Sequence, residues 1–258
     1  MNILLNGIGG HMGREVVSLC ENGYRGAHLV CGVDVVPTPS SVPVYSDFNS
    51  VPDMPIDCVV DFSHHTCIGE ILDFAISSST PVVVATTGHT EEEIAIIHRA
   101  AEKIPVFFSA NMSLGVALLV ELAKQAALAM PEADIEIIEK HHTRKLDAPS
   151  GTALMLARAI GEVREDAYAN PGRHGQGKRD KAEIGIHAVR LGNIVGEHEV
   201  IVGTPNQTIT LKHEAHSRAL FAEGALAAAA FIVDMPAGLY DMKSLVGDKK
   251  MADTATRV

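Results

Sequence analysis

Short apolar runs alternate with helix-like segments over the first half of the chain. The runs are rich in Val, Ile or Phe and are continuous rather than alternating, which is typical of parallel strands covered on both faces. They are Ile3–Leu5, Leu29–Val33, Cys58–Asp61, Pro81–Ala85 and Ile104–Phe108. The clearest helix between them begins at Thr90, where Glu93 completes a capping box. Strand–helix alternation of this kind predicts a doubly wound, Rossmann-like parallel sheet.

The pattern changes after about Asn111. An apolar helix is predicted over Leu114–Met130 and leads into a strand, a loop and a second helix. Four strands are expected here, over Asp134–Glu139, Ile184–Arg190, Glu199–Val202 and Thr208–His213. Little helix is predicted between the last three of them. Turn residues at Gly192-Asn193 and Gly203–Asn206 indicate connections between antiparallel neighbours. We therefore expect an α+β domain with an open mixed sheet that is mostly antiparallel.

Two further stretches complete the predicted organisation. Tyr168–Lys181 combines Gly, Pro and charged residues without periodicity, which is typical of a mobile loop. The chain reads as helical again from Ser217 and could return to the first domain. The expected domains are 1–111 with 217–258, which would bind a dinucleotide, and 112–216, which would bind the substrate and form the oligomer.

Composition narrows the classes of function. Apolar residues make up 47% and charged residues 21% of the 258 positions, as in an ordinary folded protein. A formal charge of −11 disfavours binding to nucleic acid or to an anionic membrane. The sequence contains neither a signal-peptide pattern nor an apolar run that could span a bilayer, so we expect a cytoplasmic protein. The four cysteines form no C-x-x-C pair and are expected to be small buried hydrophobes.

A glycine cluster follows the first predicted strand and opens a helix. Glycines allow a tight turn and a close approach of the backbone to a pyrophosphate, and the helix N-terminus then offers N–H groups and a positive dipole end. The candidate cofactor contacts in this turn are Gly7, Ile8, Gly9, Gly10, His11 and Met12, with Gly13 behind them. Asp34 ends the second strand about 20 residues beyond, as a dinucleotide fingerprint requires.

Asp34 also bears on the choice of cofactor. Its carboxylate would accept hydrogen bonds from ribose hydroxyls and would repel a 2′-phosphate, and Val35, which follows it, is not a cation. The sequence therefore favours NADH, with NADPH as the alternative.

Polar loops end three of the predicted parallel strands. Ligands bind at the carboxyl ends of such strands, so the loops should line the cofactor crevice together. They are Asp61–Ser63, Ala85, Thr86 and Thr87 with Gly88, and Ser109, Ala110, Asn111 and Met112.

The segment from His141 to Thr152 carries the candidate chemistry. His141 and His142 lie at the end of a strand close to Lys145, and histidine is the natural acid–base residue near neutral pH. Ser150 is a predicted N-cap, so Gly151 and Thr152 open a helix whose N-terminus can hold a carboxylate or phosphate. A metal site is disfavoured, because adjacent histidines do not easily share one ion and other ligands do not lie at ligand spacing.

This segment resembles the signature of the 4-hydroxy-tetrahydrodipicolinate reductase family, and the resemblance extends in order over Gly7–Gly13, Thr86–Gly88, Asn111 and Val195–Glu199. It implies reduction of an unsaturated cyclic imine dicarboxylate to tetrahydrodipicolinate, in lysine and diaminopimelate biosynthesis, by a homotetramer built through the sheet of the second domain. It also implies that His141 is the catalytic histidine and Lys145 the proton donor. His142, Gly151 and Thr152 match positions that bind the substrate's carboxylates. Gly7–Met12, Asp34, Ala85–Thr87 and Ser109–Met112 match cofactor contacts.

Two alternatives come from other classes of protein. A dinucleotide-sensing protein would keep the glycine turn but would have no need of His141 and Lys145. A semialdehyde dehydrogenase would need a nucleophilic cysteine at the mouth of the crevice, and no cysteine follows a predicted active-site strand convincingly.

Overall fold

The computed structural model describes residues 1–247, and the chain divides into two compact units. The first contains Met1–Leu114 and the segment from Arg218 onward, and the second contains Gly115–Ser217. The last residues assigned above to a dinucleotide-binding domain, 248–258, lie outside the described part.

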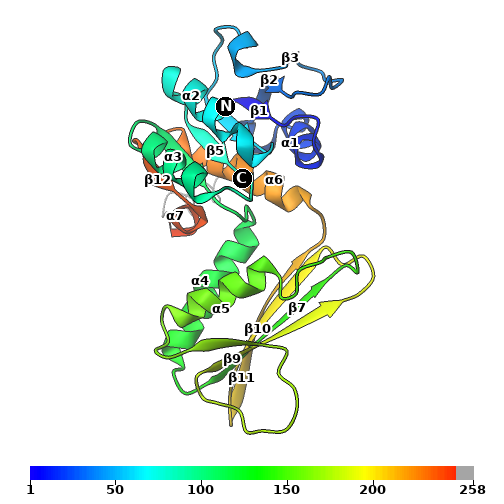
Figure 1. The fold of residues 1–258 in the computed structure, drawn as a ribbon, viewed down its shortest axis with the longest axis vertical. Helices are drawn as coiled ribbons and strands as arrows, with labels where there is room; N and C mark the ends of the chain where they lie inside the picture. Colours follow the sequence, from blue (N-terminus) through cyan, green and yellow to red (C-terminus); the bar gives the residue numbers. More distant parts are fainter. Residues whose placement is uncertain (248–258) are drawn as a thin grey trace. The chain divides into compact units, whose positions relative to one another are not determined.

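A seven-stranded parallel sheet forms the first unit (Figure 1), in the order β12-β6-β5-β4-β1-β2-β3. Its strands are β1 (Asn2–Asn6), β2 (His28–Val33), β3 (Val44–Tyr45), β4 (Cys58–Asp61), β5 (Val82–Val84), β6 (Pro105–Phe108) and β12 (Gly238–Tyr240). All five predicted strands of this half are confirmed, with ends that differ by one residue at most. The order reverses at β1, between β4 and β2, and such a switch point is where ligands bind in sheets of this type.

Helices cover both faces of this sheet. They are α1 (His11–Glu21), α2 (Ile68–Ser77), α3 (Glu91–Ala101), α6 (Ala219–Ile232) and α7 (Met242–Gly247), with short 3-10 turns at Tyr24–Gly26, Phe48–Ser50 and His65–Cys67. Right-handed crossovers place α1 on one face and α2 with α3 on the other, because the chain leaves β1 and β4 in opposite directions along the sheet. Thr90 and Glu93 form the predicted capping box of α3.

The returning segment is not entirely helical, since β12 adds a strand to the sheet edge beside β6. Helix α6 contacts α1 and the strands β4, β5 and β6. Nine of its fourteen residues are buried, most of them alanines, which is the composition expected of a helix enclosed on most sides.

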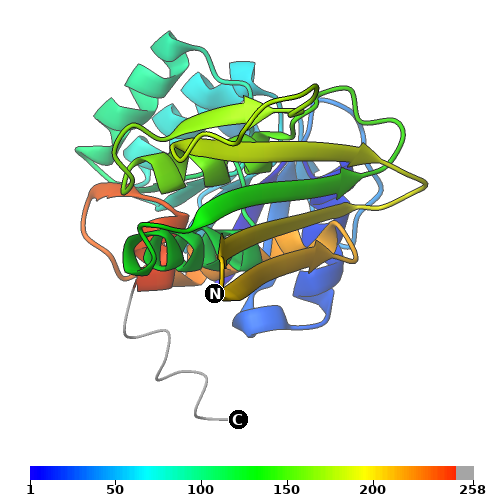
Figure 2. The same ribbon diagram turned by 90° about the horizontal axis from the view of Figure 1, so that it is seen from below.

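The second unit is a five-stranded mixed sheet with two helices on one face (Figures 1 and 2), in the order β11-β10-β7-β9-β8. Its elements are α4 (Leu114–Ala129, which begins at the last residue of the first unit), β7 (Asp134–His141), α5 (Gly151–Gly161), β8 (Tyr168–Pro171), β9 (Glu183–Arg190), β10 (Gly196–Thr204) and β11 (Gln207–Ala215). Apolar residues of α4 and α5 pack against alternate residues of β7, β9 and β10. Within the described part of this unit, the opposite face of the sheet carries no helix (Figure 2).

The expected turns and the expected strand directions of this sheet were each wrong in part. Of the two predicted turns, Gly203–Asn206 does join antiparallel neighbours, β10 and β11. Gly192-Asn193 does not, because β7 lies between β9 and β10 and pairs with β9 in parallel. Two of the four strand pairings are therefore parallel, and the sheet is less antiparallel than the turn residues suggested.

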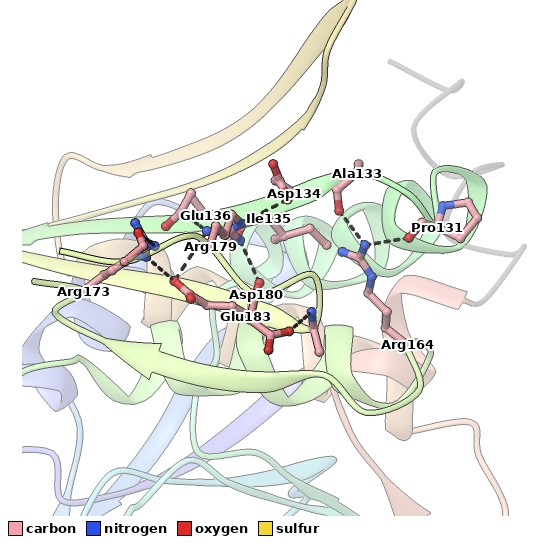
Figure 3. Close-up of polar contacts among 12 residues, drawn as sticks. Pro131, Ala133, Asp134, Ile135, Glu136, Arg164, Arg173, Arg179, Asp180 and Glu183 are labelled. Atoms are coloured by element: carbon pink, nitrogen blue, oxygen red, sulfur yellow. Dashed lines mark hydrogen bonds and ion pairs between the residues drawn. The ribbon is translucent and has the colours of Figure 1, made fainter.

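The prediction of a mobile loop over Tyr168–Lys181 was also wrong in part. Its first four residues form β8, which pairs with β9. Arg179 then fastens the rest (Figure 3): it donates to the Ile135 and Glu183 carbonyls, both at 2.7 Å, and forms an ion pair with Glu136. Periodicity does not predict these contacts, because a single arginine side chain makes them with the Ile135 and Glu183 carbonyls and with Glu136 and they involve no apolar face.

Among residues 1–247, the helices are too short or too polar to cross a membrane.

Gly224 shows how closely α6 approaches the loop after β6. A Cβ at Gly224 would lie 1.7 Å from the Met112 carbonyl oxygen, so Gly224→Ala must displace the helix or the loop. We expect a loss of about 3 kcal/mol of unfolding free energy, the upper end of the usual cost of overpacking, measured by urea unfolding. Gly69→Ala in α2 is the control: its Cβ would meet no described atom within 4 Å, so it should stabilise by about 0.5 kcal/mol. Equal stability of the two variants would contradict the close contact.

Candidate active site

The glycine turn of the first unit has the geometry of a phosphate cradle. Gly7 has φ +79°, and a Cβ there would lie 2.6 Å from the Phe62 carbonyl oxygen. A Cβ at Gly13 would lie 2.2 Å from the Gly7 carbonyl oxygen, so the turn closes tightly on the first turn of α1. Gly10 is the N-cap of α1, and within the described chain no side chain caps this helix. The N–H groups of its first turn are therefore available to an anion.

Two cavities lie at the carboxyl ends of the parallel strands of the first unit. One of about 570 Å³ is lined by Gly7, Gly9, Gly10, Asp34 and Val35 among others. A second, of about 300 Å³, is lined by Met12, Phe62, Ser63, Ala85, Thr86, Thr87, Ala110, Met112 and Phe221. Phe62 and Ser63 line both cavities. The glycine turn and the three strand-end loops, predicted to lie together, thus surround a continuous stretch of hollow surface.

Some of the predicted cofactor residues shape these loops rather than line them. Ile8 is buried and fills the space above Gly32 of β2. Ser109 donates through its hydroxyl to the Asn111 carbonyl at 2.9 Å, and the Asn111 side chain accepts from the Ser113 N–H at 2.9 Å. His11 is exposed on the first turn of α1.

Asp34 is engaged by backbone amides. Its Oδ2 accepts from the Gly9 N–H at 2.8 Å and its Oδ1 from the Val36 N–H at 3.0 Å. The carboxylate therefore holds the glycine turn to the end of β2. Each oxygen still has a further lone pair, which leaves acceptor capacity for a sugar hydroxyl.

Two interactions that the sequence did not reveal support the cofactor loops. Asp61 is buried at the end of β4 and accepts from Asn6 at 2.9 Å and from the Ser63 hydroxyl at 2.6 Å. Burial raises the pKa of its carboxyl against these hydrogen bonds. Glu93, besides capping α3, contacts His65 Nδ1 at 2.8 Å and so ties the loop after β4 to the loop after β5.

The cysteines do not offer a nucleophile at these loops. Cys20, Cys31 and Cys58 are buried, and burial raises the pKa of Cys20 and of Cys31 to about 11 and that of Cys58 further. Cys67 is half-buried at the end of a 3-10 turn beside the larger cavity. Among residues 1–247, groups of three His, Cys, Asp or Glu side chains arranged to hold a metal ion are not found.

In the second unit, His141 ends β7 with its ring against a buried carboxylate. Residues 135, 137, 139 and 141 share the buried face of the strand, as strand alternation requires. His141 Nδ1 lies 2.6 Å from Glu139 Oε2. Its Nε2 lies close to Gly196 of β10, where a Cβ would come within 3.1 Å.

Glu139 is fully buried and accepts from two further groups. Arg190 binds both of its oxygens, at 2.7 and 2.8 Å, and the Ser150 N–H binds Oε1 at 3.0 Å. Burial alone would raise the pKa of Glu139, but the hydrogen bonds from Arg190 and His141 outweigh it and hold that pKa below the usual range. Glu139 is therefore ionised at neutral pH.

The loop after His141 carries the other predicted residues. His142 is half-buried, and its carbonyl accepts from the Lys145 N–H at 3.1 Å, which closes a turn. The Lys145 ammonium lies 2.9 Å from Asp147 Oδ1, and this contact lowers the pKa of Asp147. Arg190 also donates to the Asp147 carbonyl, so the loop is tied to the same arginine that binds Glu139.

A carboxylate already lies at the N-terminus of the helix that follows, because Asp147 accepts a hydrogen bond from the Gly151 N–H. Ser150 caps α5 by accepting from the Ala153 N–H at 3.2 Å, as predicted. A Cβ at Gly151 would meet no described atom within 4 Å, and the first turn of α5 contains no acidic residue. A small anion is therefore compatible with this end of the helix.

Sequence reasoning missed Glu139, Arg190 and His198 as members of this cluster. His198 lies opposite Glu139 in the β7–β10 pairing, and Arg190 lies opposite His141 in the β7–β9 pairing. His198 Nε2 is hydrogen-bonded to Ser150 Oγ at 3.1 Å, and its ring centroid is 5.1 Å from that of His141. A glutamate on the apolar face of β7 was the one available signal for the cluster.

Comparisons with known proteins cover nearly the whole chain. Residues 1–112 match the family model of the dihydrodipicolinate reductase N-terminus, and residues 115–246 match that of its C-terminus. The 4-hydroxy-tetrahydrodipicolinate reductase of Caldanaerobacter subterraneus subsp. tengcongensis is 46% identical over 95% of this chain and 98% of its own length. That of Clostridium novyi is 41% identical over 96% and 98%.

Solved structures agree on the fold. A dipicolinate-bound dihydrodipicolinate reductase from Paenisporosarcina sp. TG-14 superposes with a TM-score of 0.78 at 27% identity, covering 93% of this chain and 97% of that one. A DAP dehydrogenase from C. glutamicum, in complex with DAP, gives a TM-score of 0.60 at 14% identity, over 100% and 98% of the two chains. The predicted fold class, a Rossmann-like sheet with a second mixed sheet, is confirmed.

His198 gives this cluster a pH-dependent contribution to stability. Its burial, and then repulsion from His141, lowers its pKa to about 4. The ordinary value of about 6.5 holds in the unfolded chain, so between these values the unfolded state binds the proton and the folded state does not. The stabilisation is complete above the higher value and is lost as the pH falls.

We expect the unfolding free energy to fall by about 2 kcal/mol between pH 7.5 and pH 5 because of the protonation of this residue in the unfolded chain. His198→Asn should lose correspondingly less over the same interval, whatever its stability at neutral pH. Urea unfolding of both proteins at the two pH values measures the difference. Identical losses would show that His198 is not held neutral in the fold.

Proposed function

The chain belongs to the dihydrodipicolinate reductase family, and we propose that it reduces the unsaturated cyclic dicarboxylate dihydrodipicolinate, formed from 4-hydroxy-tetrahydrodipicolinate, to tetrahydrodipicolinate. This is a step of lysine and diaminopimelate biosynthesis. The observation that carries the proposal is the continuous segment His141–Thr152, in which a histidine, a lysine and a helix N-terminus lie together within one family-matched unit.

The first unit binds the cofactor in this proposal. The fit rests on two features: the close backbone approaches at Gly7 and Gly13, which only glycine permits, and the cavity beside Asp34. A bound nicotinamide dinucleotide supplies hydride. The glycine turn and the N-terminus of α1 would hold its pyrophosphate, and Asp34 its ribose hydroxyls. The second cavity, lined by Ala85–Thr87, Ala110 and Met112, would receive the nicotinamide end.

The second unit binds the dicarboxylate. We assign one substrate carboxylate to the start of α5, at Ser150, Gly151 and Thr152, where the helix dipole is positive and the Gly151 N–H already binds the Asp147 carboxylate. His142 lies at the start of the same loop and would contribute to carboxylate binding. These contacts orient the substrate for reduction.

The proton comes from this unit as well. Conversion of the unsaturated cyclic imine to tetrahydrodipicolinate adds one hydride and one proton, so a proton donor is needed on the substrate side. Lys145 is a cation held at 2.9 Å by Asp147, and its ammonium is the donor in our proposal. His141 lies four residues away on the strand end and takes part as the second acid–base group.

We further propose that the enzyme assembles as a homotetramer through the sheet of the second unit. The face of that sheet opposite α4 and α5 carries no helix in the described part of the unit, and strand β11 forms its edge. A sheet face of this kind is usually covered by another layer.

The catalytic assignment predicts the effect of two substitutions. His141→Ala and Lys145→Ala should each lower kcat by about 10²-fold or more, the usual effect of losing a general acid. The assay follows oxidation of the reduced nicotinamide with freshly generated 4-hydroxy-tetrahydrodipicolinate. Lys140→Ala is the control, since Lys140 is paired with Glu197 on the other face of β7 and should not affect turnover. Near-normal turnover in both site variants would sink the mechanism.

The cofactor assignment predicts a preference for NADH over NADPH, because the Asp34 carboxylate repels a 2′-phosphate. Val35 is 82% exposed beside it and can be replaced without disturbing the core. Val35→Arg should improve kcat/KM for NADPH by about tenfold, the value of one charge-assisted contact, and leave that for NADH little changed. Val35→Gln, of similar length but neutral, should not. A clear NADPH preference in the unmodified enzyme would show that Asp34 does not decide the cofactor.

A further inference from the structure

We propose that Glu139, with Arg190 as its counter-ion, is the positioning residue of the active site: it fixes the ring of His141 as the Nδ1–H tautomer and holds it beside the α5 N-terminus. The inference rests on the proposed function for the role of His141, and on the contacts of the described residues for the tautomer. It concerns a side chain that touches no substrate, and that acts through its neighbours.

The four hydrogen bonds to Glu139 come from the elements that build the substrate site. Oε2 accepts from His141 at 2.6 Å and from Arg190 at 2.8 Å. Oε1 accepts from Ser150 at 3.0 Å and from Arg190 at 2.7 Å. One carboxylate thereby joins the end of β7, the end of β9 and the cap of α5. A shift of any of them would move the histidine relative to the anion-binding turn.

Charge decides which proton His141 carries at Nδ1. Glu139 is ionised and has no proton to donate, so the short contact at 2.6 Å requires that His141 donates from Nδ1. Nε2 is then the ring atom that can gain or lose a proton. Arg190 makes this arrangement possible, because a buried carboxylate without a partner would take up a proton or unfold the site.

The arrangement of donors around Glu139 predicts the effect of Glu139→Gln. The amide nitrogen of a glutamine in place of Oε1 would face the Ser150 and Arg190 donors, and neither can give up its proton. In place of Oε2 it would face Arg190 and His141, and only His141 can become an acceptor, by moving its proton to Nε2. The substitution should therefore invert the tautomer of His141 while preserving the size and shape of the side chain.

The experiment combines kinetics with the nitrogen resonances of the imidazole rings. Two-bond ¹H–¹⁵N spectra of the intact protein identify the protonated ring nitrogen, and His141→Asn identifies the His141 signals by their loss. We expect Nδ1–H in the unmodified protein and Nε2–H in Glu139→Gln, in which kcat should fall by about 10²-fold with an unchanged dissociation constant for the dinucleotide.

Glu136→Gln is a matched control. Glu136 lies on the same strand, on the opposite face, and it also pairs with an arginine and a histidine, Arg179 (Figure 3) and His187. It should leave kcat and the His141 signals unchanged, so that an effect of Glu139→Gln cannot be ascribed to loss of any paired carboxylate on β7.

The outcomes separate this inference from the proposed function. An Nε2–H tautomer in the unmodified protein overturns the inference even if Glu139→Gln fails to fold. An unchanged His141 tautomer in a folded Glu139→Gln overturns it as well, whatever the activity. If the unmodified protein does not turn over 4-hydroxy-tetrahydrodipicolinate, the proposed function fails, and the spectra still test the role of Glu139.

Discussion

A negative charge buried inside the second unit constrains everything around it. The Glu139 carboxylate is fully buried, and a charge in that position is tolerated only when its lone pairs are satisfied and a counter-ion is close. Arg190 supplies the charge, and His141 and Ser150 supply the remaining donors. Because these partners come from β7, β9 and the start of α5, satisfying one carboxylate fixes the relative positions of three elements.

The first unit meets a different constraint with different means. Its phosphate cradle depends on glycines, because the turn at Gly7 and the close approach at Gly13 leave no room for a Cβ. What a ligand meets there is backbone N–H groups and a helix end, which recognise a phosphate by geometry and are indifferent to the rest of the molecule. Asp34 ties this turn to the end of β2 by accepting from the Gly9 N–H.

How much of the fold could be predicted from the sequence depends on how far apart along the chain the interacting residues lie. The parallel strands, the capping box of α3 and the Ser150 cap are determined by residues within a few positions of one another, and sequence pattern found them. Strand order in the second sheet depends on which non-adjacent segments pair, so the turn at Gly192-Asn193 suggested a wrong neighbour. The loop held by Arg179 was missed because its order comes from the acceptors Ile135 and Glu136, more than forty positions away.

The same reasoning explains which site residues were found. His141, Lys145 and Ser150 lie within ten positions and carry recognisable chemistry, so they could be read together. Arg190 and His198 reach the cluster only through strand register, about fifty positions later in the chain. Glu139 directly precedes this segment, but a glutamate beside a lysine is usually a surface residue. Only the alternation of buried and exposed residues along the whole of β7 indicates that Glu139 is buried.

Division of the work between the two units has a chemical consequence. In the proposed function, backbone groups hold the pyrophosphate of the cofactor. Because a substitution cannot remove a backbone group, cofactor binding of this kind survives changes in most side chains. The substrate side depends on ionised and hydrogen-bonded side chains whose roles are shared, since Glu139 serves His141 and Ser150 at once. A single substitution there changes orientation and anion binding together. Loss of catalysis with retained dinucleotide binding is therefore the more accessible route of divergence for this architecture, and the intact His141–Glu139–Arg190 cluster is the physical argument that this chain has not taken it.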